Sequence, residues 1–248
     1  MSKDSTTELR NALYGRSCVF VGSLETPTER IVYHILHETI RSGKTVIWVC
    51  IRDTPNIIFD KFSHYGLPLA VSEQKLWIVD ATITGDRTIT PQTSRCTPLD
   101  YAGMIMEVGK LLEKKPASLV MLDNIGVLAA LDRTEAIVRP LKYMDIKIRV
   151  AGGGFVTMLT SNAVKGSTEA ELIGFIDVVI NVGEEKIHAQ VGSKGLSIPY
   201  CFTGNELVLG STDADKDLRE LFSLTRDEKQ KLELEVEEKV HLYGEAID

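Results

Sequence analysis

The segment at residues 21–36, VGSLETPTERIVYHIL, has the setting of a phosphate-binding loop between a strand and a helix. An apolar run ending at Gly22 predicts a buried strand, and apolar residues at helical spacing after it predict a helix. The motif G-x-x-x-x-G-K-[ST] uses this setting to surround phosphates with backbone N–H groups and a lysine. Gly22 matches its first glycine, whereas Pro27, Thr28 and Glu29 occupy its last three positions.

These three residues lack the chemistry that a bound triphosphate needs. Pro27 has no N–H donor and cannot adopt the positive φ that glycine allows. Thr28 carries no charge in place of the lysine, and Glu29 puts a negative charge where the triphosphate would lie. Glu25 adds a second carboxylate to the same loop. The sequence therefore predicts a degenerate phosphate site.

Further polar residues follow the other predicted strands. They are Arg52 with Asp53, then Asp80, Asp123 and, after the next strand, Asn162. In open α/β sheets the ligand crevice lies beyond the carboxyl ends of the strands. We therefore expect these side chains and the loop residues to share one edge of the sheet. The cysteines and histidines show no ligand spacing, so no metal site is expected.

The elements that would position these residues alternate along the chain. Continuous apolar strands between amphipathic helices predict an α/β fold with a mainly parallel sheet and helices on both faces. The predicted strands are Cys18–Gly22, Thr45–Ile51, Leu76–Asp80, Ser118–Asp123, Gly154–Thr160 and Asp177–Val182. The predicted helices are Pro27–Ser42, Pro55–Tyr65, Leu99–Glu113, Pro140–Val150 and Thr168–Phe175. Short segments at Ile187–Val191, Ile198–Phe202 and Leu207–Leu209 predict an antiparallel extension of the sheet.

The C-terminal part differs from the rest, which predicts an α/β domain over residues 1–210 and an acidic helical tail over 211–248. Ser211–Asp217 is a predicted linker, and Thr225–Glu228 is a capping box that opens a last helix. Because an isolated helix of this length is marginal in water, its apolar stripe must pack on the body, a second copy or another protein. The stripe, a candidate docking surface, comprises Leu232, Val236, Val240, Tyr243 and Ile247, and it is preceded by Leu218, Leu221, Phe222 and Leu224.

Charge and hydropathy limit the classes of function. The net charge is −7, and residues 211–248 hold twelve Asp and Glu against six Lys and Arg, so the body is nearly neutral. Without a basic face, a nucleic-acid partner is not expected. No apolar run approaches the ~18 residues of a membrane span, and the first residues lack a signal-peptide pattern. A cytoplasmic protein with no membrane contact is expected.

In order and spacing, these segments resemble the KaiC-like branch of the RecA superfamily of P-loop ATPases, a family abundant in archaea. The stretches GRSCVFVG with its helix, IRDTP at Ile51–Pro55 and LVMLDN at Leu119–Asn124 carry the resemblance. It covers most of the chain and implies a RecA-like fold. In the family, the aspartate matching Asp123 holds Mg²⁺, and the glutamate matching Arg52 activates the attacking water, while Asp53 keeps the second acidic position.

The family also contacts a neighbouring subunit's nucleotide through a Lys-x-Arg-Gly segment, of which Lys194 is the remnant here. Three parts of the ATP machinery are thus altered together. The resemblance implies a non-catalytic, KaiC-like pseudo-ATPase that regulates or scaffolds through contacts with a protein partner or other copies of itself, without ATP or Mg²⁺. One alternative is an ATPase with slow or unusual hydrolysis that uses Lys44, Lys165 or Lys194. A third is a sensor of another small ligand at the strand ends.

The resemblance also gives an expectation for Arg52. In RecA-like sheets the strand before Arg52 lies beside the strand before Asp123. An unpaired carboxylate at a partly buried strand end is costly. We therefore expect the guanidinium of Arg52 to pair with Asp123 in place of Mg²⁺; the alternative is an Arg52 side chain that points to solvent.

Overall fold

The computed structural model describes residues 4–69, 75–82, 92–210 and 214–223. Its strands are β1 (Ser17–Gly22), β2 (Val46–Cys50), β3 (Leu76–Asp80), β4 (Thr93–Arg95), β5 (Leu119–Leu122), β6 (Gly154–Thr160), β7 (Val178–Val182), β8 (Lys186–Val191), β9 (Lys194–Thr203) and β10 (Glu206–Leu209). Its helices are α1 (Asp4–Ala12), α2 (Thr28–Arg41), α3 (Pro55–His64), α4 (Tyr101–Lys114), α5 (Ile125–Leu131), α6 (Thr134–Val150), α7 (Gly166–Ile173) and α8 (Ala214–Ser223).

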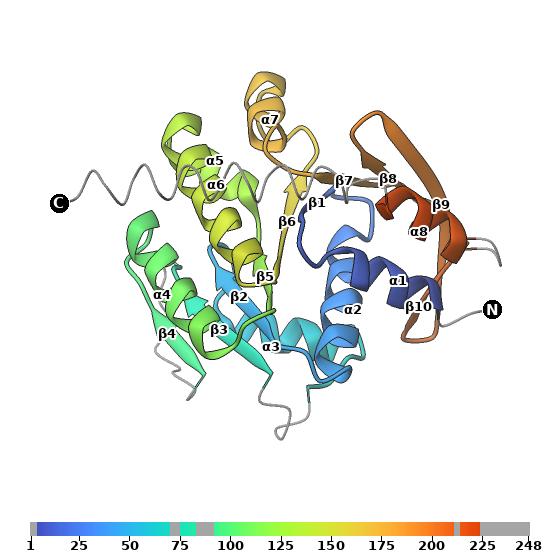
Figure 1. The fold of residues 1–248 in the computed structure, drawn as a ribbon, viewed down its shortest axis with the longest axis horizontal. Helices are drawn as coiled ribbons and strands as arrows, with labels where there is room; N and C mark the ends of the chain where they lie inside the picture. The colour runs from blue at the N-terminus through green and yellow to red at the C-terminus, as the bar shows by residue number, and fades with distance from the viewer. Residues whose placement is uncertain (1–3, 70–74, 83–91, 211–213, 224–248) are drawn as a thin grey trace.

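Within these residues the strands form one sheet in the order β10-β9-β8-β7-β1-β6-β5-β2-β3-β4 (Figure 1). The strands from β7 to β4 are parallel, and β8, β9 and β10 extend the sheet in antiparallel pairs. Every residue of β1, β2 and β5 is buried, whereas β8 alternates between buried and exposed residues. The predicted α/β fold, with its mainly parallel sheet and antiparallel extension, is confirmed.

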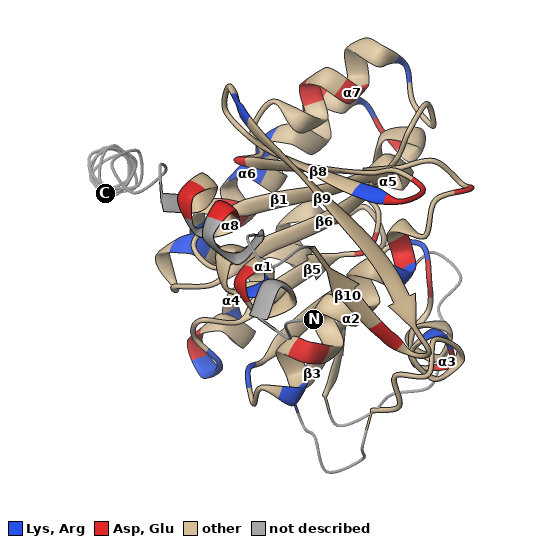
Figure 2. Ribbon diagram, turned by 90° about the vertical axis from the view of Figure 1, so that its right-hand side faces the viewer, with Lys and Arg blue, Asp and Glu red and all other residues tan. Residues whose placement is uncertain are grey.

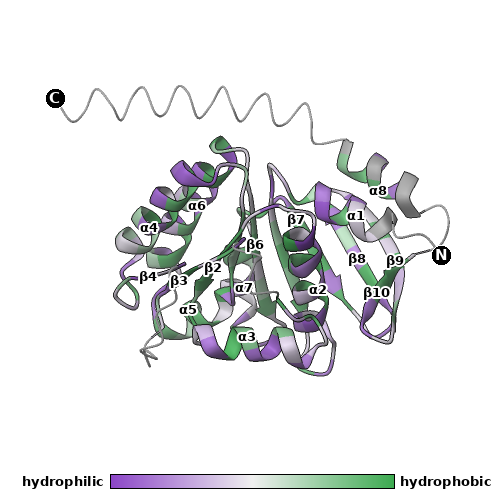
Figure 3. Ribbon diagram, turned by 90° about the horizontal axis from the view of Figure 1, so that it is seen from below, coloured by the Kyte–Doolittle hydropathy of each residue, from purple (hydrophilic) through white to green (hydrophobic). Residues whose placement is uncertain are grey.

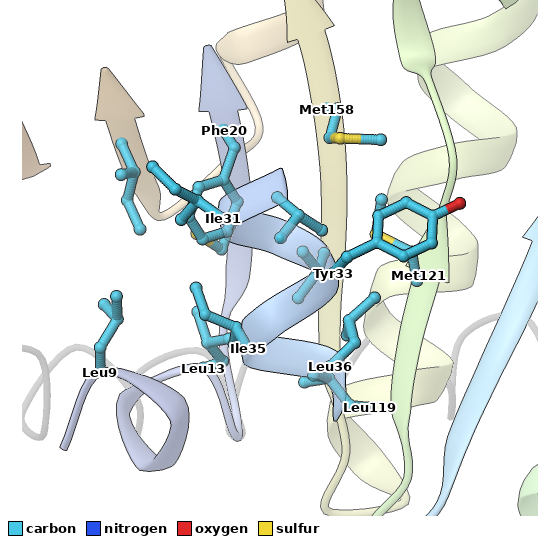
Figure 4. Packing of buried hydrophobic residues seen from close by; sticks show 14 of the residues in the cluster. Leu9, Leu13, Phe20, Ile31, Tyr33, Ile35, Leu36, Leu119, Met121 and Met158 are labelled. Carbon is cyan, nitrogen blue, oxygen red and sulfur yellow. The ribbon is translucent and has the colours of Figure 1, made fainter. Parts of the chain in front are cut away.

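Helices cover both faces of the parallel strands, as predicted. One apolar core joins the sheet to α1, α2, α3 and α8, and the other joins it to α4, α5, α6 and α7. Successive residues of β1 alternate between these cores, as strand geometry requires. Figure 3 shows the apolar strands between helices whose polar residues lie outside. In Figure 4, Ile31 of α2 lies toward Phe20 of β1, and Ile35 of α2 lies toward Leu13, the residue just after α1.

Helix α6 begins at Thr134, six residues before the predicted start at Pro140. The prediction used Pro140 as a first helical residue, where its missing N–H is harmless. A proline inside a helix costs about 3 kcal/mol. Ile137 and Leu141, on either side of Pro140, are both fully buried, and burying each such side chain is worth about 1.5–3 kcal/mol. Their burial offsets the cost of the proline.

Three further elements are not predicted by the sequence. Helices α1 and α5 have 9 and 7 residues, and β4 has 3. Helix α1 has only two apolar residues, α5 is apolar at nearly every position and β4 has no apolar residue, so none of the three shows a helical or strand period.

Helix α8 corrects the prediction of a linker over Ser211–Asp217, because the helix already begins at Ala214. Leu218, Leu221 and Phe222 are buried, and α8 packs against α1 and β9. Arg16 holds the end of α8: its guanidinium donates to the carbonyl oxygen of Phe222 and lies 5.2 Å from the centre of that ring. The apolar stripe of Leu232, Val236, Val240, Tyr243 and Ile247 lies outside the described residues, as does Leu224.

Charged residues lie mainly on the helices and loops, and the central parallel strands carry almost none (Figure 2). No helix in the described part of the chain combines the length and the apolar character needed to cross a membrane.

Candidate functional site

The carboxyl ends of β1, β6, β5 and β2 form one edge of the sheet, where the predicted loop residues and strand-end residues meet. β6 lies between β1 and β5, and β2 is the next strand beyond β5. At this edge the N–H of Ser161, just after β6, donates to the carbonyl oxygen of Gly22 over 2.8 Å. Arg52 and Asp53 follow β2, and Asp123 follows β5.

The loop between β1 and α2 closes over Gly22. A Cβ atom at Gly22 would lie 1.9 Å from Oγ1 of Thr28 and 2.5 Å from Oγ1 of Thr26. These two hydroxyls are hydrogen-bonded to each other over 2.9 Å, and Thr28 is buried. The residue in the lysine position therefore packs inward, onto the glycine at the start of the loop.

The negatively charged group near the N-terminus of α2 is a side chain of the protein itself. Pro27 occupies the N-cap without a side-chain cap, and Glu29 is the acidic residue of the first turn. Helix N-termini attract anions because their N–H groups are unpaired and the helix dipole is positive there. Glu29 thus supplies a carboxylate at the end of the helix where a phosphate-binding loop would hold a phosphate.

Four charged side chains form a closed ring at this edge, which we call the charge ring: Glu29, Arg52, Asp53 and Lys61. Nη2 of Arg52 lies 3.1 Å from Oε1 of Glu29 and 2.5 Å from Oδ2 of Asp53. Nζ of Lys61 lies 2.6 Å from Oδ2 of Asp53 and also pairs with Oε1 of Glu29. The side chains are 13–34% exposed, so solvent screens them only in part. Two acids and two bases make the ring neutral.

The ring fixes the protonation states of Arg52 and Asp53. Burial disfavours the charge of Arg52, but the hydrogen bond and charge of Asp53, together with Glu29, raise the pKa of Arg52 overall. Burial likewise disfavours the charge of Asp53, but the hydrogen bonds from Arg52 and Lys61 lower the pKa of Asp53 overall. Arg52 is therefore always a cation and Asp53 an anion at neutral pH, and Arg52 cannot act as a general base.

Asp123 is bound by backbone groups. Its Oδ2 accepts hydrogen bonds from the N–H groups of Ile51 (3.0 Å), Arg52 (2.9 Å) and Asp53 (3.1 Å). Its Oδ1 is buried and accepts no hydrogen bond from the described residues. Burial raises the pKa of Asp123 to about 6, although the three N–H groups and the charge of Arg52 oppose the rise.

The expected side-chain pair between Arg52 and Asp123 is not formed. Within the described residues the guanidinium of Arg52 pairs with Glu29 and Asp53, while Asp123 binds the backbone N–H of Arg52 instead. The reason lies in the chain direction after β2: three successive N–H groups point at Asp123, so the side chain of Arg52 extends away from it. The alternative of an Arg52 pointing freely to solvent is also wrong, because two carboxylates hold it.

The residues at this edge fit a Mg²⁺–triphosphate poorly. One oxygen of Asp123 is committed to three N–H groups, and Glu29 stands in the position of the hydroxyl that would help to hold the metal. Two cations, Arg52 and Lys61, lie in the same ring. Among the described residues, no three His, Cys, Asp or Glu side chains are grouped to hold a metal ion.

The other predicted site residues lie apart from the charge ring. Asn162 is exposed, with a φ of 60°, in the turn after β6. Lys194 begins β9 opposite Val191, which in turn pairs with Val178 at the amino end of β7, so Lys194 lies at the opposite edge of the sheet. Lys44 precedes β2 at that same opposite edge, and its Nζ lies 4.0 Å from the ring centre of Tyr14.

Two polar residues at the edge have local structural roles. Asp80 accepts hydrogen bonds from the N–H (3.1 Å) and hydroxyl (2.7 Å) of Thr82 and pairs with Arg95 over 3.3 Å. Asn124 caps α5 by accepting from the N–H of Gly126 over 2.9 Å. Neither side chain joins the charge ring.

Sequence reasoning missed Lys61. It lies near the end of α3, 32 residues from Glu29 and eight from Asp53, and no motif marks it. Only the placement of α2 and α3 beside each other brings its ammonium group between the two carboxylates.

No protein-family model matches the chain, and no curated protein matches its sequence. The function is therefore inferred from the geometry of this edge of the sheet.

Proposed function

We propose that this chain is a non-catalytic, KaiC-like pseudo-ATPase on a RecA-like scaffold, which acts as a regulatory or scaffolding protein through protein–protein contacts. The charge ring of Glu29, Arg52, Asp53 and Lys61 carries the proposal, because it fills the strand-end site with the chain's own charges.

Electrostatics support this proposal. A working phosphate loop offers a lysine and a metal ion to a highly negative triphosphate. The charge ring is neutral, and each of its cations already contacts two carboxylates. Two unit charges 4 Å apart interact by about 4 kcal/mol at an effective dielectric constant of 20. A phosphate near Glu29 would meet a repulsion of this order from that carboxylate, while the cations of Arg52 and Lys61, already paired with Glu29 and Asp53, leave the ring with no net attraction for it.

Catalytic chemistry is lacking for a separate reason. Hydrolysis needs a group that orients or deprotonates the attacking water. Arg52 holds the position of that base in the family, and its guanidinium has no lone pair for a proton. An ATP molecule that did bind would still lack this group.

The alternative function, an ATPase with slow or unusual hydrolysis, draws support from Asp123 and from the cation of Lys61. Both lie at the edge where a nucleotide would bind. Lys61 replaces Lys44 and Lys194 as the candidate cation, since those two lie at the opposite edge. In the ring, however, Lys61 is bound to Glu29 and Asp53.

Calorimetry with Mg-ATP and a phosphate-release assay test the proposal. We expect no turnover and no binding tighter than about 10 μM, which is about −7 kcal/mol. Tighter binding or measurable turnover would overturn the pseudo-ATPase assignment. Thr28→Lys alone should restore neither, because Glu29 and Arg52 remain and Thr28 is buried against Gly22.

A double variant tests the ring itself. Glu29→Gln with Asp53→Asn frees both cations and should bind ATP at least tenfold more tightly than the unmodified chain. Asp60→Asn with Glu171→Gln is the matched control, since it removes two exposed carboxylates outside the ring. Equal gains in both variants would mean that overall charge, rather than the ring, limits binding.

Light scattering of the full chain, with and without Mg-ATP, tests the second half of the proposal. Association through protein contacts should not change with ATP. Assembly that requires ATP would instead favour the ATP-binding alternative.

A further inference from the structure

A network of charged side chains joins the last turns of α6 to the amino ends of β1 and β7, at the edge of the sheet opposite the charge ring. Nη2 of Arg149 lies 2.5 Å from Oδ2 of Asp145, one turn earlier on α6, and its Nη1 lies 3.0 Å from Oδ2 of Asp177, which precedes β7. The same oxygen of Asp177 accepts hydrogen bonds from the N–H (2.9 Å) and the hydroxyl (3.1 Å) of Ser17, the first residue of β1. One guanidinium thus links α6 to the starts of two strands.

The network holds one cation against two carboxylates, so it carries one surplus negative charge when both acids are ionised. The side chain of Asp145 is 0% exposed, whereas that of Asp177 is 26% exposed. Oδ2 of Asp177 has three donors, but Oδ1 of Asp145 is buried and accepts no hydrogen bond from the described residues. A buried acid that lacks compensation avoids the cost of its charge by taking up a proton. Of the two acids, Asp145 is therefore the one that binds the surplus proton.

We propose that Asp145, Arg149 and Asp177 form a proton-operated clamp, in which a proton on Asp145 determines whether Arg149 pairs with two carboxylates or with Asp177 alone. In the ionised state the two acids share the guanidinium, and the surplus charge stays buried. In the protonated state Asp145 is neutral, and the charge of Arg149 is matched by that of Asp177. The protonated state is then the one in which α6 is held more firmly to β1 and β7.

Few other groups act on the charge of Asp145. Burial raises the pKa of Asp145 to about 7; Arg149 opposes the rise, Asp177 adds to it, and Lys142 opposes it. Helix α5 and β6, which pack against α6, contain no titratable residue. The residues that α4 and α7 bury are apolar. Both charge states of Asp145 are therefore populated near neutral pH.

Asp177 has partners that keep it charged. Arg149 and both donors of Ser17 bind its Oδ2, and Arg16, just before β1, adds a second positive charge that interacts with it. The thiol of Cys18 stays neutral, because burial raises its pKa. Asp177 thus remains the charged partner of Arg149 when Asp145 takes up a proton.

Carbon-13 NMR of the side-chain carboxyl groups, recorded on the full chain between pH 4.5 and 8.5, tests the proposal. The carboxyl signal of Asp145 should titrate with a midpoint of about 7, whereas an ordinary aspartate titrates at about 3.9. The guanidinium nitrogen signals of Arg149 should change with the same midpoint, because Nη2 loses a charged partner. Asp145→Asn assigns the carboxyl signal by removing it.

Asp177→Asn tests the competition between the two acids. It removes one negative charge, while the amide oxygen can still accept hydrogen bonds from Ser17. The midpoint of Asp145 should then fall by at least about half a unit, because a neighbouring like charge no longer disfavours its ionised form. Asp60→Asn is the matched control, since it removes an exposed carboxylate on α3, on the other face of the sheet. It should leave the midpoint unchanged.

The unfolding equilibrium gives a second measurement. The folded state binds the proton of Asp145 more tightly than the unfolded state does, so the stabilisation is present at low pH and is lost as the pH rises through about 7. Relative to Asp145→Asn, the unfolding constant of the natural chain should fall roughly thirtyfold from pH 8.5 to pH 5.5. All other acids, Asp123 included, are common to both proteins and cancel.

Three results would overturn the proposal. A midpoint of Asp145 below about 5, closer to that of an ordinary aspartate, would mean that the acid stays charged and the clamp has one state. Arg149 signals that do not follow the titration of Asp145 would mean that the proton leaves the ion pairs unchanged. A midpoint that Asp177→Asn does not move would mean that the two acids do not compete for Arg149. The first two results are read on the unmodified chain, so they do not depend on whether a variant folds.

Discussion

Asp123 is expected to make the stability of this protein depend on pH in a way that Asp123→Asn removes. Burial raises the pKa of this carboxyl to about 6 in the folded state, compared with 3.8 for an ordinary aspartate. The folded state therefore binds the proton of Asp123 more tightly than the unfolded state does. The resulting stabilisation is fully present below pH 3.8 and is lost as the pH rises through 6.

The size of the effect follows from the shift. One pKa unit corresponds to 1.36 kcal/mol, so the difference between about 6 and 3.8 amounts to about 3 kcal/mol in all. Only part of this free-energy difference develops within the pH range of the experiment. Between pH 8 and pH 4.5 the free energy of unfolding of the natural chain should gain about 2 kcal/mol relative to Asp123→Asn. An asparagine keeps an oxygen that can accept from the three N–H groups.

Urea denaturation of both proteins at several pH values between 4.5 and 8 measures this difference. Other titrating groups are common to both proteins and cancel in the comparison. Repeating the series in 1 M salt tests whether burial or nearby surface charges raise the pKa of Asp123. The effect of burial does not depend on salt, whereas surface charges are screened. A difference that stays constant with pH, or that disappears in salt, would refute the assignment of a buried carboxyl with a raised pKa.

Two further predictions concern the loop and the charge ring. Gly22→Ala should lower the free energy of unfolding by about 1–3 kcal/mol, because its Cβ would overlap Oγ1 of Thr28; urea denaturation checks this, and an unchanged stability would mean that the loop opens freely. Arg52→Ala should cost only about 1–2 kcal/mol, since two partly exposed ion pairs are lost and Lys61 still contacts both Glu29 and Asp53. A loss of 3 kcal/mol or more would indicate that Arg52 compensates the buried charge of Asp123 after all.

The strands of the parallel sheet could be predicted from the sequence because they are buried on both faces. Such strands are continuous apolar runs, and polar residues mark their carboxyl ends, as with Asp123 after β5. The order of the strands is not encoded locally in this way; only the adjacency of β2 and β5 was expected, from the family resemblance, and those strands do pair.

The elements that were missed depend on contacts between distant segments. The start of α6 was misplaced because Pro140 has a strong local preference that the burial of Ile137 overrides. Helix α8 was taken in part for a linker because its first residues are polar, and only its packing on α1 fixes Leu218 in a core. Local pattern and tertiary packing disagree at both places, and packing decides.

At the candidate site, the sequence identified which chemical groups are missing but not how the remaining ones pair. The replacements at Pro27, Thr28 and Glu29 are visible in a motif. The partner of Arg52 depends on where three backbone N–H groups point, and the role of Lys61 depends on the placement of α3 against α2. Neither can be read from spacing along the chain.

Apart from Oδ1 of Asp123, the charged groups at this edge are paired within the chain, which makes it harder for the site to regain an anionic ligand. Glu29 lies in the first turn of α2, three N–H groups bind Asp123, and the cations of Arg52 and Lys61 are each held by two carboxylates. An anion that entered would have to replace these internal contacts rather than fill unpaired groups. Each replacement exposes a charge that is now paired, and breaking such pairs is costly where solvent is partly excluded. Restoring one residue at a time therefore leaves the other contacts in place, which is why Thr28→Lys alone is expected to fail.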